Sequence, residues 1–177
     1  MKILYIWDGL REPLPKDREE CISATRAIYP NAKYACITKL NFFLEGFEVI
    51  SWDDVLHQMV KDFNLSEVPR SWNRFMEFSD WARFWYLANN PNTMYSDTDC
   101  QMLKYFDFEK QIKFIYPKKE IFLLYSPQSG MGKNSMELLK YTLSKNITGL
   151  LLPIYTRLDK VPWATKIPDE YVSHKGR

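Results

Sequence analysis

Short apolar stretches alternate along the chain with longer segments in which apolar residues recur every three or four positions. Buried parallel strands typically give the first pattern, and amphipathic helices give the second. Strands are predicted at residues 3–7, 33–38, 47–52, 93–96, 113–116 and 121–125. Helices are predicted at residues 17–28, from 51 or 53 to 63, 71–89 and 135–143. This alternation predicts an α/β fold with a largely parallel central sheet.

The helix predicted at residues 71–89 has the most regular pattern. Apolar side chains at helical spacing define one face: Phe75, Phe78, Ala82, Trp85 and Tyr86. We expect that face to be core, with Asp80 and Arg83 on a flank of the same helix. The turn-forming run at residues 89–92 ends the helix.

Two aspartates directly follow predicted strands. Asp8 comes after the first strand, and Asp97 comes after the strand at residues 93–96. In open α/β sheets, ligands gather at the carboxyl ends of the strands. Both aspartates are therefore expected near a bound ligand.

The chain has 177 residues, and we expect a single compact domain spanning residues 1–177. Its net charge of +2 gives no strong field for a polyanion such as nucleic acid. Three cysteines without a CxxC pair argue against a disulfide framework or a structural zinc site, so a reducing, cytoplasmic location is expected. No apolar run approaches the ~20 residues that span a bilayer, and we expect no stable membrane insertion.

Asp97 and Asp99 are separated by one residue at a predicted strand end. Two carboxylates placed in this way can face one site, and they suit Mg²⁺ or Mn²⁺, which leave positions open for phosphate oxygens. Such a short motif is weak by itself, because a solvated turn with two acids gives the same pattern.

A longer pattern surrounds the two acids. It comprises Ser79-Asp80, Arg83, Leu87, a turn at residues 89–92, and Tyr95-Ser96-Asp97-Thr98-Asp99. This spacing closely resembles the signature of the DXD-motif sugar transferases. That family includes yeast-type mannosyltransferases, capsular and lipopolysaccharide transferases, and relatives of the large glucosylating bacterial toxins. The family usually has Gly-Gly in the turn, where this chain has Asn90-Pro91-Asn92. Asn tolerates a left-handed backbone, so we interpret the difference as a substituted turn.

The resemblance implies a GT-A fold, with a Rossmann-like, mostly parallel sheet and flanking helices. It implies a metal-dependent glycosyltransferase that moves a hexose from a UDP- or GDP-sugar to an acceptor hydroxyl, with retention of configuration. Mn²⁺ or Mg²⁺ is the implied cofactor, and the acceptor is a glycan, a protein or a modified nucleic-acid base. The implied catalytic residues are Asp97 and Asp99, and His174 joins them as metal ligands. The implied nucleotide-sugar contacts are Trp7, Asp8, Asp80, Arg83, Ser96 and Asp97.

Several of these residues have a simpler interpretation. Trp7 at a strand end could be ordinary core, or it could contact a nucleobase. Asp80 and Arg83, three residues apart on a helix, could be a surface ion pair. His174 could belong to a disordered terminus instead of a metal site.

Other functions remain open. A module that binds a nucleotide sugar or glycan without turnover would keep the same fold, and the altered turn would be its clue. A phosphohydrolase with an Asp-x-Asp pair usually carries the pair after the first strand, followed two residues later by Thr or Val. Here the pair lies mid-chain and is followed by Gln101. The glycines at residues 130 and 132 do not make a phosphate loop, because Pro127 and Asn134 occupy positions that the motif requires to be Gly and Ser or Thr. A mobile turn at residues 130–134 could still approach the donor or acceptor.

Overall fold

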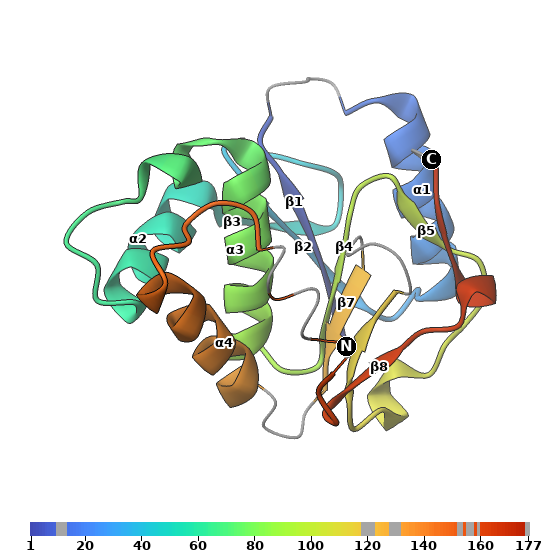
Figure 1. Ribbon diagram of the computed structural model, residues 1–177. Helices are drawn as coiled ribbons and strands as arrows, with labels where there is room; N and C mark the ends of the chain where they lie inside the picture. Colours follow the sequence, from blue (N-terminus) through green and yellow to red (C-terminus); the bar gives the residue numbers. More distant parts are fainter. Residues whose placement is uncertain are drawn as a thin grey trace.

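The computed structural model describes residues 1–9, 14–117, 123–127, 132–151, 154, 158 and 160–175. A seven-stranded sheet lies at its centre, in the order β3-β2-β1-β4-β7-β6-β8 (Figure 1). The strands are β1 (Lys2–Trp7), β2 (Lys33–Thr38), β3 (Phe47–Ser51), β4 (Thr93–Ser96), β6 (Phe114–Tyr116), β7 (Leu123–Ser126) and β8 (Ala164–Lys166). Strand β7 is antiparallel to both of its neighbours, and the other pairs are parallel. The predicted α/β fold with a largely parallel sheet is confirmed.

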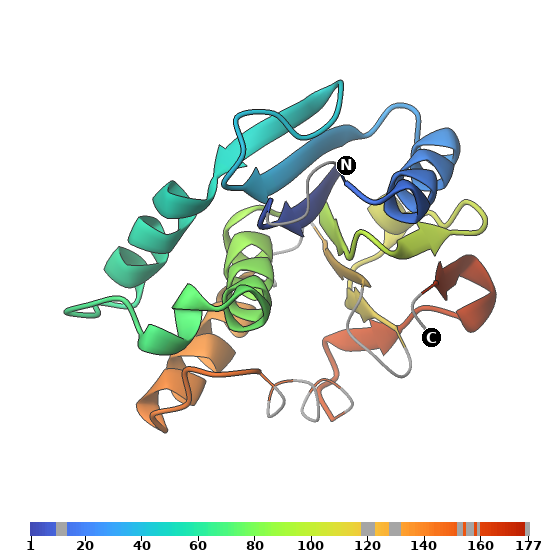
Figure 2. The same ribbon diagram turned by 90° about the horizontal axis from the view of Figure 1, so that it is seen from above.

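Helices cover both faces of this sheet. They are α1 (Lys16–Ile28), α2 (Trp52–Asp62), α3 (Phe75–Asn89) and α4 (Gly132–Ser144). Helix α1 lies on one face, and α2, α3 and α4 lie on the other (Figures 1 and 2). Side chains of β1 alternate between the two cores, because successive residues of a strand point to opposite faces. Leu4 and Ile6 pack toward α3, whereas Tyr5 and Trp7 pack on the side of α1.

Helix α3 differs from its prediction in two ways. The segment at residues 70–73 is a separate 3₁₀ helix, η1 (Arg70–Asn73), and the extended backbone of Arg74 divides it from α3. The prediction also buried only one face of the helix, whereas every residue at positions 77–87 is buried. The reason is that α3 packs against the sheet, α2, α4 and η1. Asp80 and Arg83 are therefore inside the molecule.

A small second sheet joins distant parts of the chain. Strand β5 (Cys100–Met102) pairs antiparallel with β9 (Val172–His174), so that Cys100 lies opposite His174. The backbone nitrogen of Lys175 also donates to the carbonyl of Asp99, at 2.9 Å. Neither short strand was predicted, since their pairing depends on residues about seventy positions apart in the sequence. The pairing returns the C-terminal segment to the turn after β4.

Some predicted features extend beyond the described residues. The strand predicted at 121–125 is observed as β7, while residues 121–122 lie outside the description. Residues 130–131 of the turn predicted at 130–134 also lie outside the described residues. Across the described ranges, no helix is both long and apolar enough to cross a membrane.

The turn before β4 contains a residue with a left-handed backbone, which Asn tolerates in place of Gly. Asn92 has φ +54°, in the left-handed region. Its side chain is held at both ends: Tyr125 Oη donates to Oδ1 at 3.1 Å, and Nδ2 donates to Glu109 Oε1 at 3.3 Å. The Asn-Pro-Asn sequence therefore preserves the turn that leads into β4.

Replacing Asn92 with alanine is expected to destabilise the fold by roughly 1–2 kcal/mol, because a Cβ without a compensating polar group strains a left-handed residue. Asn92→Gly should cost less, since glycine populates this region freely. Urea unfolding of both variants measures the difference. Equal stability of the alanine and glycine variants would show that the left-handed backbone carries no cost here.

Candidate functional site

A cavity of about 450 Å³ opens where β1 and β4 end, between α1 and α3. Its described lining comes from these two strand ends, the two helices and the segment before residue 151. The lining residues are Ile6, Trp7, Asp8, Arg18, Phe75, Met76, Ser79, Asp80, Arg83, Tyr95, Asp97, Thr98, Asp99 and Leu150. The cavity thus occupies the carboxyl edge of the parallel strands, where ligands of α/β proteins bind.

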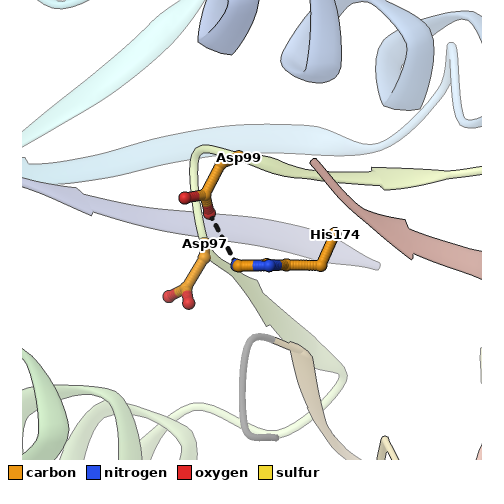
Figure 3. A group of neighbouring side chains, drawn as sticks. All are labelled: Asp97, Asp99 and His174. Carbon is orange, nitrogen blue, oxygen red and sulfur yellow. Dashed lines mark ion pairs between the residues drawn. The ribbon is translucent and has the colours of Figure 1, made fainter. Parts of the chain in front are cut away.

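Asp97 and Asp99 line this cavity. Figure 3 shows that His174 lies beside these two acids. One ligand atom from each of the three lies within 4.8 Å of the others. His174 Nε2 is 3.1 Å from Asp99 Oδ1, and the β5–β9 pairing holds the histidine in place. Two carboxylates and an imidazole form a donor set that fits a divalent cation. The alternative of a disordered terminal histidine does not describe this structure.

Asp97 is partly buried beside two donors. The Tyr95 hydroxyl donates to its Oδ1, and Arg83 Nη1 lies 3.7 Å from the same oxygen. Burial raises the pKa of the Asp97 carboxyl above its ordinary value, while the positive charge of Arg83 and the Tyr95 hydrogen bond oppose the rise. A cation bound beside this carboxylate would also favour its charged form.

Asp80 and Arg83 form a buried, hydrogen-bonded pair. Their exposed fractions are 5% and 8%, and Arg83 Nη2 lies 3.4 Å from Asp80 Oδ1. The backbone nitrogen of Leu151 donates to Asp80 Oδ2 at 3.1 Å. Arg83 donates to the carbonyl and hydroxyl oxygens of Ser79, both at 3.1 Å, and its guanidinium lies over the Tyr95 ring. The surface-pair interpretation is therefore wrong, and both side chains are fixed at the cavity wall.

The structure brings Trp7 and Asp8 to the cavity, but it does not bring Ser96 there. Trp7 is 6% exposed, so it is a core residue whose ring also lines the cavity. Ser96 is 1% exposed and is absent from the cavity lining given above for the described residues. Side chains alternate along β4, and Tyr95 takes the position facing the cavity. The nucleotide-sugar contact of Ser96 stays a prediction, which the cavity lining does not support.

Arg18, Phe75 and Thr98 line the cavity, although the sequence analysis did not predict them as site residues. Arg18 extends from the first turn of α1 and lies 3.3 Å from Asp99 Oδ2. Phe75, at the start of α3, adds a third aromatic ring to the lining besides those of Trp7 and Tyr95. Thr98, between the two acids, accepts a hydrogen bond from Arg18. Arg18 lies in no recognisable motif, and Phe75 fits equally well as one member of a core face.

The charges of the described lining favour a cation. Four carboxylates, from Asp8, Asp80, Asp97 and Asp99, face two guanidinium groups, from Arg18 and Arg83. With all six ionised, the lining carries two negative charges in excess, and a divalent cation would balance them. The cavity then presents both a cation and arginine side chains to an anionic ligand.

No protein-family model matches the chain, and no curated protein matches it in sequence. Several solved structures share its fold. The PaToxG glycosyltransferase aligns with a TM-score of 0.57 and 12% identity, over 91% of this chain and 69% of that protein. The glycosyltransferase GlyE from Streptococcus pneumoniae TIGR4 aligns with a TM-score of 0.55 and 13% identity, over 95% of this chain and 46% of GlyE.

A third match has different chemistry. The CTP:phosphocholine cytidylyltransferase from Streptococcus pneumoniae aligns with a TM-score of 0.51 and 8% identity, over 98% of this chain and 92% of that enzyme. Identities this low establish the fold alone. The chain has the GT-A fold, and the residues of the cavity must carry the argument for function.

Proposed function

We propose that the chain is a metal-dependent glycosyltransferase, which transfers a hexose from a UDP- or GDP-sugar to an acceptor hydroxyl. The observation that carries the proposal is one cavity in which the Asp97–Asp99–His174 group faces the buried Asp80–Arg83 pair. The first group suits a cation and diphosphate, and the second suits sugar hydroxyls. The glycosyltransferases among the structures of the same fold support this assignment.

Asp97, Asp99 and His174 are proposed to hold Mn²⁺ or Mg²⁺. A cation bound there neutralises charge that develops on the departing diphosphate. The chain's own contribution is orientation, because Tyr95 holds Asp97 and Arg18 lies beside Asp99. Asp97 and Asp99 are the proposed catalytic residues, because they would hold the cation beside the departing diphosphate.

Asp80 and Arg83 are proposed to position the transferred sugar. Asp80 Oδ1 is ion-paired with Arg83, and Oδ2 accepts a hydrogen bond from the Leu151 backbone, so the carboxylate is oriented before substrate binds. Each carboxylate oxygen can accept more than one hydrogen bond, which leaves capacity for sugar hydroxyls. Such preorganisation lowers the entropy cost of holding the sugar for transfer.

Trp7 and Asp8 are proposed to contact the nucleoside. The Trp7 ring offers a flat surface or edge for the base, and Phe75 adds a second ring in the same cavity. The carboxylate of Asp8 can accept hydrogen bonds from ribose hydroxyls. These residues lie at the end of β1 and the start of α3.

Retention of configuration is proposed from the resemblance of residues 78–100 to the DXD-motif enzymes, and we assign no side chain as a general base. The proposed acceptor is a glycan, a protein or a modified nucleic-acid base.

The altered turn before β4 was the expected clue to a non-catalytic module. Because Asn92 adopts the left-handed backbone there, the turn gives that alternative no support.

A thermal-shift screen tests the donor class. A nucleotide sugar present with Mn²⁺ at 100 times its dissociation constant should stabilise the fold by ~2.7 kcal/mol. For a chain of this size, that corresponds to a rise in the midpoint of roughly 5–10 °C. Omission of Mn²⁺ should greatly reduce the shift. If no UDP- or GDP-sugar stabilises the chain with Mn²⁺ present, the proposed donor class is wrong.

A further inference from the structure

Arg18 joins the metal-site turn to helix α1. Its Nη1 donates to Thr98 Oγ1 at 2.6 Å and lies 3.3 Å from Asp99 Oδ2. Its guanidinium also lies over the Trp7 ring, 5.7 Å from the ring centroid. Three contacts to three different residues restrain this side chain.

Arg18 contacts one of the two carboxylate oxygens of Asp99, and His174 contacts the other. Oδ2 faces Arg18, whereas Oδ1 lies 3.1 Å from His174 Nε2. The two oxygens thus face different partners, and rotation of the carboxylate would break the ion pair with Arg18. The oxygen that faces His174 is the one suited to share a cation with it.

Asp97 is held in a comparable way from the opposite face of the sheet. Arg83 of α3 lies beside Asp97 Oδ1, and the Tyr95 hydroxyl donates to the same oxygen. Helices α1 and α3 cover opposite faces (Figure 2). Each helix therefore contributes one arginine that contacts one of the two acids.

Thr98 makes the Arg18 contact specific. Its side chain is buried, with an exposed fraction of 3%, and its hydroxyl accepts the Arg18 bond inside the turn. An arginine that only balanced surface charge would have no need of this buried acceptor. A lysine at position 18 would keep the charge but would lack the planar guanidinium that lies over the Trp7 ring and holds Nη1 beside the Thr98 and Asp99 oxygens.

We infer that Arg18 is a positioning residue, which orients the Asp99 carboxylate so that Oδ1 faces the cation together with His174 and Asp97. This inference rests on the proposed function. It makes a prediction opposite to that of simple electrostatics. Removal of a positive charge beside a cation site strengthens cation binding if charge alone matters. Loss of an orienting partner weakens cation binding, typically on the order of 10- to 100-fold.

Mn²⁺ binding separates these effects without need of a sugar donor. Free Mn²⁺ is measured by electron paramagnetic resonance during titration of the wild-type chain, Arg18→Gln and Arg18→Lys. Arg26→Gln is the matched control, because Arg26 lies on the same helix but contacts the Glu45 carbonyl outside the cavity. Far-UV circular dichroism checks that each variant is folded.

The expected result is a 10- to 100-fold weaker Mn²⁺ affinity for Arg18→Gln, with only partial recovery in Arg18→Lys and no change in Arg26→Gln. Equal or tighter binding by a folded Arg18→Gln would overturn the inference and leave the proposed function standing. An equally large loss in folded Arg26→Gln would also overturn it, since the loss would then not depend on the contacts of Arg18 with Thr98 and Asp99. If the wild-type chain binds no Mn²⁺, the proposed metal dependence itself fails.

Discussion

Asp80→Ala is expected to lower the free energy of unfolding by about 3–5 kcal/mol, because it removes the nearer of the two carboxylates paired with a buried arginine. Asp80 and Arg83 are 5% and 8% exposed, and their charged atoms are 3.4 Å apart. The substitution also removes the acceptor for the Leu151 backbone nitrogen. Urea unfolding measures the loss.

The double variant Asp80→Ala/Arg83→Met distinguishes the cause. It removes the buried guanidinium that has lost its nearer carboxylate, so much of the stability should return while nucleotide-sugar binding stays lost. Lys104→Ala is the control, since Lys104 forms an exposed ion pair with Glu170 and its loss should cost far less. A loss for Asp80→Ala as small as that of the control would contradict the buried-pair account.

Asp99→Ala is expected to reduce kcat/KM for donor turnover on the order of 10²- to 10³-fold, equivalent to about 3–4 kcal/mol of transition-state stabilisation. The physical reason is the loss of a cation ligand whose two oxygens face His174 and Arg18. Release of nucleoside diphosphate from UDP- and GDP-sugars gives the rate without knowledge of the acceptor. Added Mn²⁺ should restore little of it.

Glu20→Ala is the matched control for this experiment. Glu20 is an acid on α1 that pairs with Lys175 and is not among the cavity residues named above. Its loss should leave turnover near the wild-type rate. If folded Asp99→Ala turned over donor as fast as Glu20→Ala, Asp99 would have no catalytic role.

The parts of the structure that rest on local pattern were predictable. Strands β1, β2 and β4 follow short apolar runs, and α3 follows helical periodicity with a Pro-containing turn after it. The motif residues from Asp80 to Asp99 also lie within one continuous segment of the sequence. The sequence could therefore predict that these residues lie near one another, as they do in the lining of one cavity, although periodicity alone placed Asp80 and Arg83 too close to the surface.

The parts that depend on distant contacts were not predictable. Strands β5 and β9 are three residues each, and only their pairing holds His174 beside the acids. Arg18 reaches the site because α1 packs against β5, a contact that leaves no pattern in the first turn of the helix. The motif also could not predict burial, since Ser96 lies within it but is 1% exposed and is not among the cavity residues named above.

The fold does not by itself separate sugar transfer from nucleotidyl transfer, because the cytidylyltransferase shares it. Both chemistries use a nucleotide and a diphosphate group. The buried Asp80–Arg83 pair is the feature that favours a sugar at the reacting end of the cavity. Loss of this pair should accordingly weaken binding of nucleotide sugars more than it weakens binding of the free nucleoside diphosphate.

The most direct test of the central claim is donor turnover with and without EDTA. The wild-type chain is incubated with UDP- and GDP-sugars, and release of nucleoside diphosphate is followed. The account predicts that EDTA abolishes release from the accepted donor and that Mn²⁺ or Mg²⁺ in excess of EDTA restores it. Undiminished release in EDTA that also survives Asp99→Ala would contradict a cation held by Asp97, Asp99 and His174.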